Sequence, residues 1–139
     1  MSNLILFFDT ETTGLPNKKP PTDPNQARLI QLATILAFPE GETLNTLNTL
    51  VKIGNAFMHP LAQEAHGISR ENANSEGIHP KEAFEKFHSM SESAECLVCH
   101  NHNFDFNIII QRYRDWETDR KSTRLNSSHS AKSRMPSSA

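Results

Sequence analysis

Short apolar runs, separated by polar and proline-containing stretches, dominate the pattern of this chain. Runs of this length, rich in Leu, Ile, Val, Phe and Thr, predict buried strands. The predicted strands cover residues 4–8, 28–38, 43–53 and 96–99. A turn at residues 39–42 joins the second to the third, so we expect the first three strands to form an antiparallel meander. The proline-rich segment 17–26 predicts an exposed loop.

Two prolines mark the starts of helices, because proline fits the first helical turn. Pro60 opens a short helix that Gly67 ends, and Pro80 opens a longer one. Apolar residues recur in the longer helix at a spacing that gives one buried face. They are Ala83, Phe84, Phe87 and either Met90 or Ser91. An amphipathic stretch at residues 103–114 predicts another helix, and the whole indicates one α/β domain with a mixed sheet.

Two carboxylates follow the first apolar run, at Asp9 and Glu11. Side chains at positions i and i+2 of a strand point to the same face, so the two can converge. Neighbouring carboxylates repel each other, and a hard cation such as Mg²⁺ or Mn²⁺ would relieve that repulsion. The structural alternative is a strand that ends in solvated acidic residues.

A third carboxylate, Asp105, lies near the start of the helix that follows the strand at residues 96–99. If that strand neighbours the strand at residues 4–8, all three carboxylates meet at one end of the sheet. Ligands of α/β proteins usually bind at strand ends. The alternative role for Asp105 is to stabilise the first turn of its helix.

These two segments resemble the first two sequence motifs of the DnaQ-like 3′–5′ exonucleases, which include the proofreading subunit of bacterial DNA polymerase III. The first segment is F-D-T-E-T-T-G-L-P, beginning at Phe8, and the second is H-N-x-x-F-D, beginning at His100. Between them, R-L-I-Q-L-A from Arg28 and A-H-G-I-S from Ala65 are also similar to the family. The resemblance covers residues 3–114.

The resemblance implies a ribonuclease H-like mixed β-sheet flanked by helices, with two Mg²⁺ or Mn²⁺ ions. Asp9 would bridge the ions, Glu11 would hold one and Asp105 the other. The implied substrate-binding residues are Thr10, Thr12, Gly14, Leu15, His66 and Asn101. On sequence alone, His66 is as well explained by an interaction with the end of its helix. The implied substrate is a single-stranded DNA or RNA 3′ end, and the family also suggests a DNA polymerase as a partner.

The family carries a third motif, H-x-x-x-x-D, which supplies a general base and a fourth carboxylate. Here the nearest candidate is His129, and Arg134 stands where the Asp is needed. We therefore expect a domain that is incomplete at the C-terminus, with residues 1–114 a partial exonuclease domain of impaired activity. The competing reading is a non-catalytic metal-binding or nucleic-acid-binding fragment. Residues 115–139 contain seven Ser and a basic run, which predicts disorder. They also resemble translated linker or adapter sequence, so we expect a non-native tail.

Charge is distributed unevenly along the chain. Five of the 14 basic residues and none of the 16 acidic residues lie from Arg120 onward, which leaves nine basic against 16 acidic residues, a net charge of −7, before it. An acidic body argues against tight, sequence-independent binding of duplex DNA, which needs a basic surface.

The two cysteines, Cys96 and Cys99, form a C-x-x-C-H pattern with His100, as in c-type haem attachment. Haem attachment normally requires export, and the chain shows neither a secretory signal nor an apolar stretch of membrane-spanning length. A zinc site that adds His102 lacks a second ligand pair at suitable spacing. We therefore expect reduced thiols, largely buried on a strand, in a cytoplasmic protein.

Overall fold

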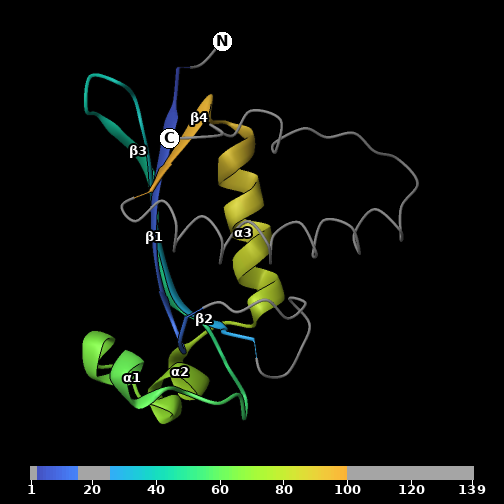
Figure 1. Ribbon diagram of the computed structural model, residues 1–139. Helices are drawn as coiled ribbons and strands as arrows, with labels where there is room; N and C mark the ends of the chain where they lie inside the picture. Colours follow the sequence, from blue (N-terminus) through green and yellow to red (C-terminus); the bar gives the residue numbers. More distant parts are fainter. Residues whose placement is uncertain (1–2, 16–25, 100–139) are drawn as a thin grey trace.

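A computed structural model of the protein describes residues 3–15 and 26–99 (Figure 1). Within these residues the chain forms four strands and three helices. In chain order they are β1 (Ile5–Thr12), β2 (Leu29–Ala37), β3 (Thr43–Leu50), α1 (Pro60–His66), α2 (Arg70–Glu76), α3 (Pro80–Glu92) and β4 (Cys96–Cys99). The predicted helix at residues 103–114 and the predicted tail at residues 115–139 lie outside the described residues.

The strands form one mixed sheet in the order β3-β2-β1-β4. Antiparallel pairing of β1 with β2 and of β2 with β3 confirms the predicted meander. The fourth strand, β4, pairs in parallel with β1, from Ile5–Cys96 to Phe8–Cys99. The two strands that precede the acidic motifs are therefore neighbours, which is the condition under which the three carboxylates could meet at one end of the sheet.

The central strand, β1, continues beyond its apolar run. Leu6, Phe8, Thr10 and Thr12 are all buried, so one alternating face extends from the apolar residues into the polar ones. Pairing with β2 continues to Thr12, opposite Leu29. Asp9 and Glu11 consequently lie within the strand rather than in a turn after it.

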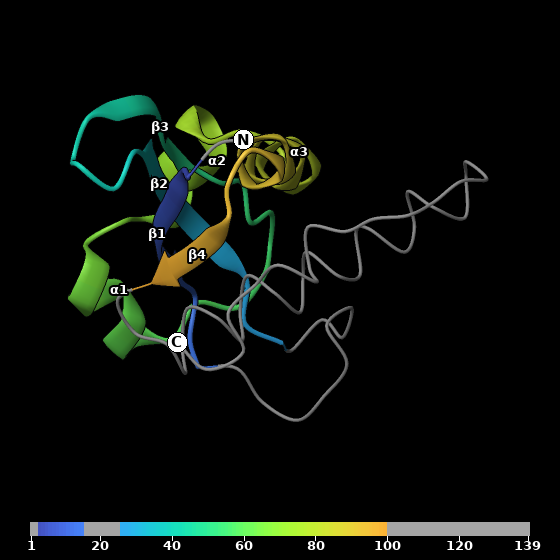
Figure 2. The same ribbon diagram turned by 90° about the horizontal axis from the view of Figure 1, so that it is seen from above.

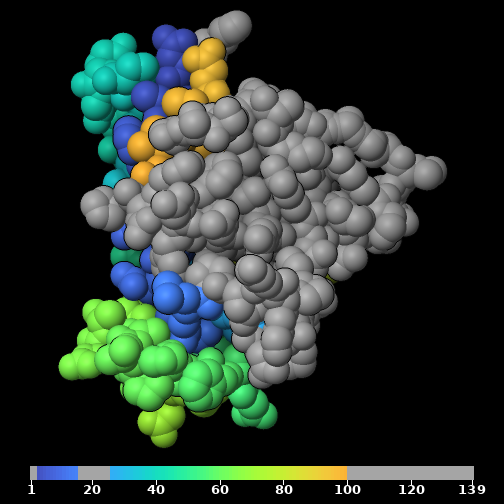
Figure 3. Space-filling model, in the orientation of Figure 1, coloured from blue at the N-terminus to red at the C-terminus, as the bar shows by residue number. Residues whose placement is uncertain are grey.

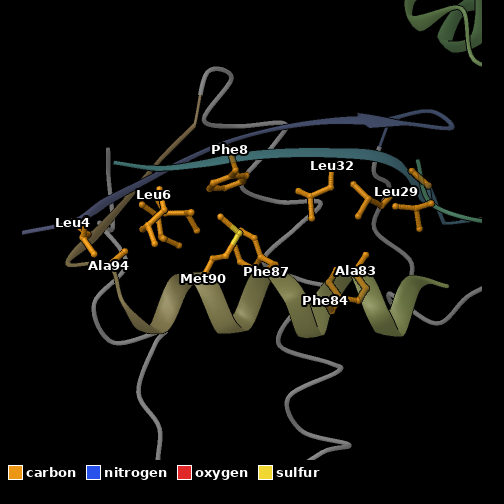
Figure 4. Packing of buried hydrophobic residues seen from close by; sticks show 14 residues of the cluster. Leu4, Leu6, Phe8, Leu29, Leu32, Ala83, Phe84, Phe87, Met90 and Ala94 are labelled. Atoms are coloured by element: carbon orange, nitrogen blue, oxygen red, sulfur yellow. The ribbon is translucent and has the colours of Figure 1, made fainter. Parts of the chain in front are cut away.

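The longest helix among the described residues, α3, covers one face of the sheet (Figures 1 and 2). Figure 4 shows side chains of β1 and β2 meeting those of α3 across this interface. Phe8 and Phe87 pack edge to face, with ring centroids 5.3 Å apart. Thr34 donates a hydrogen bond through Oγ1 to the sulfur of Met90 at 3.1 Å. The predicted helix face is confirmed, and Met90 and Ser91 are both buried.

The helix α2 was not predicted. Its N-cap Ser69 accepts a hydrogen bond from the Asn72 amide, and its only buried residue is Ala73. With a single buried position it lacks the apolar periodicity that reveals a helix in a sequence. It packs over a second, smaller core cluster formed by Ile30, Ile53, Met58, Ile68 and Ala73.

Cys96 and Cys99 lie on a strand, as expected, but they are only partly buried rather than core residues. The reason is the short strand that carries them. Of its four residues only Leu97 is buried, while Val98 is 39% exposed. Among the described residues no disulfide forms and no helix is long and apolar enough to cross a membrane.

Candidate active site beside β1

The two carboxylates of β1 lie on the face of the sheet opposite α3, which we call the outer face. Asp9 is exposed and Glu11 is partly exposed, whereas Thr10 between them is buried on the α3 side. In the strand register Asp9 lies opposite Ala33, and Glu11 lies opposite Gln31. Strand alternation therefore directs both carboxylates to one face, as the i and i+2 spacing predicted.

This pair of carboxylates suits a hard divalent cation. Mg²⁺ and Mn²⁺ prefer oxygen ligands, and neither carboxylate would have to leave a buried position to bind one. The amide of Thr10 donates to Oδ1 of Asp9 at 3.0 Å, which helps to fix that carboxylate. Among the described residues no three His, Cys, Asp or Glu side chains gather into a metal-binding group. A complete site would therefore need a further ligand from the rest of the chain.

The end of β4 lies close to these carboxylates. The last pair of the parallel ladder is Phe8 with Cys99, one residue before Asp9. Residues beyond Cys99 therefore start from the immediate neighbourhood of Asp9. Asp105 and Asn101 lie outside the described residues, so the prediction that they join the site stays a prediction.

A groove of about 590 Å³ lies beside Glu11, between the end of β1 and α1. In Figure 3 the blue surface at the end of β1 borders the green surface that contains α1. We call this cavity the β1–α1 groove. Its lining residues are Glu11, Thr12, Gly14, Leu15, His59, Leu61, Ala62, Ala65 and His66.

Two histidines form hydrogen bonds that hold α1 against the end of β1. At the start of the helix, the backbone amide of His59 donates to the carbonyl of Thr13 at 2.8 Å. At its end, Nε2 of His66 lies 3.1 Å from the carbonyl of Thr12. Since α1 has no buried residue, these bonds are important for holding it in place.

The hydrogen bonds of His66 define its tautomer. Its Nδ1 accepts a hydrogen bond from the Ile68 amide at 3.0 Å, so Nδ1 carries no proton. The proton of the neutral ring is then on Nε2, which donates to the Thr12 carbonyl. Both ring nitrogens are engaged within the chain, so His66 forms a wall of the groove and is not positioned to take a proton from a ligand.

The other predicted substrate-binding residues are placed differently from one another. Leu15 is 78% exposed in the groove, and Gly14 lines it. Thr12 also lines the groove, but its hydroxyl donates to the Gly14 carbonyl at 2.7 Å and shapes the turn. The side chain of Thr10 is buried, and Thr10 is not among the residues that line the groove.

The sequence reasoning missed the wall that α1 contributes. Leu61, Ala62 and Ala65 line the groove, and Leu61 is 68% exposed. Their spacing places them along one side of the helix. The available sequence signal was the spacing of these three apolar residues, which gives the short helix one apolar side. That side could have been interpreted as a surface that faces a ligand.

A second, apolar hollow of about 310 Å³ lies on the other side of Asp9. It is lined by Phe7, Phe8, Asp9, Ala33, Ile35, Val98 and Cys99. We call it the outer-sheet hollow. The two carboxylates therefore lie between an apolar hollow and the β1–α1 groove.

Taken together, the mixed sheet and the acidic pair on its central strand define a ribonuclease H-like nuclease fold. The model of a protein family described as Exonuclease, RNase_T, matches residues 6–127. The chain therefore belongs to this exonuclease family. No curated protein sequence matches it.

Several solved structures have the same fold. Escherichia coli exonuclease I in complex with a 5cy-dA13 oligonucleotide aligns with a TM-score of 0.67 and 24% identity, over 83% of this chain and 24% of that one. A product-bound exonuclease I aligns with a TM-score of 0.68 and 23% identity, over 83% and 26%. A zinc-bound complex of E. coli exonuclease I with single-stranded DNA aligns with a TM-score of 0.67 and 23% identity, over 83% and 24%. The present chain thus spans about a quarter of the length of these proteins.

Proposed function

We propose that this chain is the nuclease domain of a metal-dependent 3′–5′ exonuclease that hydrolyses phosphodiester bonds at single-stranded nucleic-acid ends. The observation that carries the proposal is the position of Asp9 and Glu11. They share the outer face of β1, and Glu11 also lines the β1–α1 groove. Membership of the exonuclease family supports the same reaction.

The proposed metal ligands are Asp9, Glu11 and Asp105, holding two Mg²⁺ or Mn²⁺ ions. Asp105 is six residues beyond Cys99, a span of about 22 Å at full extension, so it can return to Asp9. Divalent cations held there would supply Lewis-acid polarisation of the phosphodiester and an activated water. Both residues reach the surface, Asp9 as an exposed and Glu11 as a partly exposed residue.

The terminal nucleotide is proposed to occupy the β1–α1 groove. Leu15 and Leu61 provide apolar surface for a base. Gly14 also lines the groove, and a Cβ there would make an ordinary contact of 3.6 Å with the Cβ of His59. His66 stabilises the α1 wall of the groove through its hydrogen bond to the Thr12 carbonyl. Asn101, which lies outside the described residues, remains a proposed substrate contact.

Single-stranded DNA is the substrate that we favour over duplex DNA. The similar solved structures include exonuclease I with dA13, dA16 and dT13 oligonucleotides and a complex with SSB-Ct. The net charge of −7 before Arg120 gives little electrostatic attraction for a duplex. RNA ends and a DNA polymerase partner remain predictions of the family resemblance, as does a cytoplasmic location.

The alternative function is non-catalytic binding of a metal or of nucleic acid by an incomplete domain of residues 1–114. The observation that favours it is the lack of an H-x-x-x-x-D pair after Asp105. Both functions use the same carboxylates and the same groove. They differ only in whether bound substrate is hydrolysed.

Dependence of binding on a 3′ end tests the proposal. With Mn²⁺ present, the chain should bind a linear oligonucleotide, protected by a 3′-terminal phosphorothioate linkage, more tightly than a circular one of the same sequence. The Glu11→Gln variant should lose this preference, whereas Glu42→Gln, on an exposed turn, should keep it. Equal affinity of the wild-type chain for linear and circular DNA would contradict the proposal.

A further inference from the structure

Three large exposed apolar side chains lie at or beside the β1–α1 groove. The large exposed apolar residues among those described are Phe7, Leu15, Ile35, Leu44, Phe57, Leu61 and Val98. Leu15 and Leu61 line the groove, and Phe57 contacts its wall residue His59. Single exposed apolar residues are ordinary on a protein surface, but a group of them beside a cavity indicates binding.

Phe57 is the aromatic residue of this group, so its ring can make a specific stacking contact. It is 67% exposed, although Met58, the next residue, is buried in the second core cluster. Its ring centroid lies 6.3 Å from that of His59, with the ring planes at 79°. A perpendicular contact of this kind leaves at least one face of the phenyl ring open to a further partner.

The loop before Phe57 is fixed by α2. Asn74 accepts hydrogen bonds through Oδ1 from the backbone amides of residues 53 and 54, both at 2.9 Å. Arg70 donates through Nη1 to the carbonyl of Ala56 at 2.7 Å. A surface aromatic ring on a fixed loop loses little conformational freedom when it binds, which favours affinity.

We infer that Phe57 is a stacking platform for a base of the single-stranded substrate, next to the nucleotide held in the β1–α1 groove. This inference rests on the function proposed above. An aromatic side chain stacks on any of the bases, because each has a π face, so the platform would bind without sequence preference. It would extend the substrate site along the surface from His59 to Phe57.

The test compares binding of two ligands to wild type and to Phe57→Ala, both with Mn²⁺. One ligand is a nucleoside monophosphate, and the other is a single-stranded oligonucleotide protected by a 3′-terminal phosphorothioate linkage. Phe57→Ala should weaken oligonucleotide binding about 5- to 150-fold, the range for loss of one stacked base. Binding of the monophosphate should be unchanged. Phe57→Trp should retain tight binding, and Leu44→Ala, an exposed apolar control on β3, should have no effect.

Oligonucleotides with single abasic positions identify the stacked base. An abasic residue at the stacked position should remove the difference between wild type and Phe57→Ala, because the ring then has no base to contact. Equal oligonucleotide binding by wild type and Phe57→Ala would overturn the platform while leaving the proposed function intact. A wild-type chain that binds neither ligand would overturn both.

Discussion

At the scale of single residues, the direction of Asp9 and Glu11 follows from strand alternation and could be predicted from their spacing. The positions and roles of the other predicted site residues could not be assigned from the motif alone. Thr10 belongs to the same motif, yet the same alternation buries it on the α3 side. The role of His66 also needed the structure, because it depends on Thr12 and Ile68 hydrogen bonds that no sequence pattern reveals.

Replacing His66 tests whether it holds the α1 wall of the groove in place. His66→Ala removes two hydrogen bonds, and since α1 has no buried residue, we expect a loss of only about 1–3 kcal/mol in the free energy of unfolding. Nucleoside monophosphate affinity should fall because the groove wall is released. Urea unfolding and equilibrium binding measure the two effects.

The matched control is His88→Ala on α3, where the ring pairs with Glu92 away from the groove. It should leave monophosphate affinity unchanged. If His66→Ala also binds the monophosphate like wild type, the histidine is not needed to shape the groove.

At the scale of elements, apolar runs made β1, β2 and β4 predictable, and the prolines at positions 60 and 80 marked the starts of α1 and α3. Only α3 of these two helices also has a buried apolar face. The sequence of β3, T-L-N-T-L-N-T-L, lacks apolar alternation. It forms a strand because it pairs with β2 at the edge of the sheet, where most of its side chains are exposed. The exposure of Cys96 and Cys99 was not predictable, since a short apolar run does not reveal that β4 buries only Leu97.

Gly77 controls the approach of α2 to the end of β3. A Cβ at this position would lie 2.9 Å from the carbonyl carbons of Leu50 and Val51. The amide of the next residue, Ile78, also donates a hydrogen bond to the Leu50 carbonyl at 2.9 Å. Gly77→Ala should therefore lower the free energy of unfolding by about 1–3 kcal/mol, as measured by urea denaturation.

A control for this prediction is Gly14→Ala, where the added Cβ would make an ordinary contact at 3.6 Å. It should change the free energy of unfolding much less. Equal stabilities of the Gly77 variant and wild type would show that α2 can shift without cost.

At the scale of the whole molecule, the described residues provide a sheet, one covered face and one open face. Phe7, opposite Ile35 on β2 and beside Val98 on β4, leaves an apolar strip on the outer face next to Asp9. The carboxylates and the groove are therefore present, while the sequence lacks the third family motif. We therefore expect binding and hydrolysis to be separable in this chain.

We expect the 139-residue chain to hydrolyse DNA slowly. A missing general base typically lowers a rate about 10²- to 10⁴-fold, and the fourth carboxylate is missing as well. The measurement is release of label from a 3′-labelled single-stranded oligonucleotide with Mn²⁺, with Asp9→Ala as background. Rapid turnover that Asp9→Ala abolishes would show that another group supplies the base, and His129 would be the first to replace.

The central claim is that Asp9 and Glu11 form part of a divalent-metal site. Titration of the chain with Mn²⁺, followed by calorimetry, tests it most directly. Wild type and the surface control Glu42→Gln should bind Mn²⁺ alike, and Asp9→Ala should abolish binding because it removes the carboxylate that is proposed to bridge the two ions. Unchanged Mn²⁺ binding in Asp9→Ala would contradict the account.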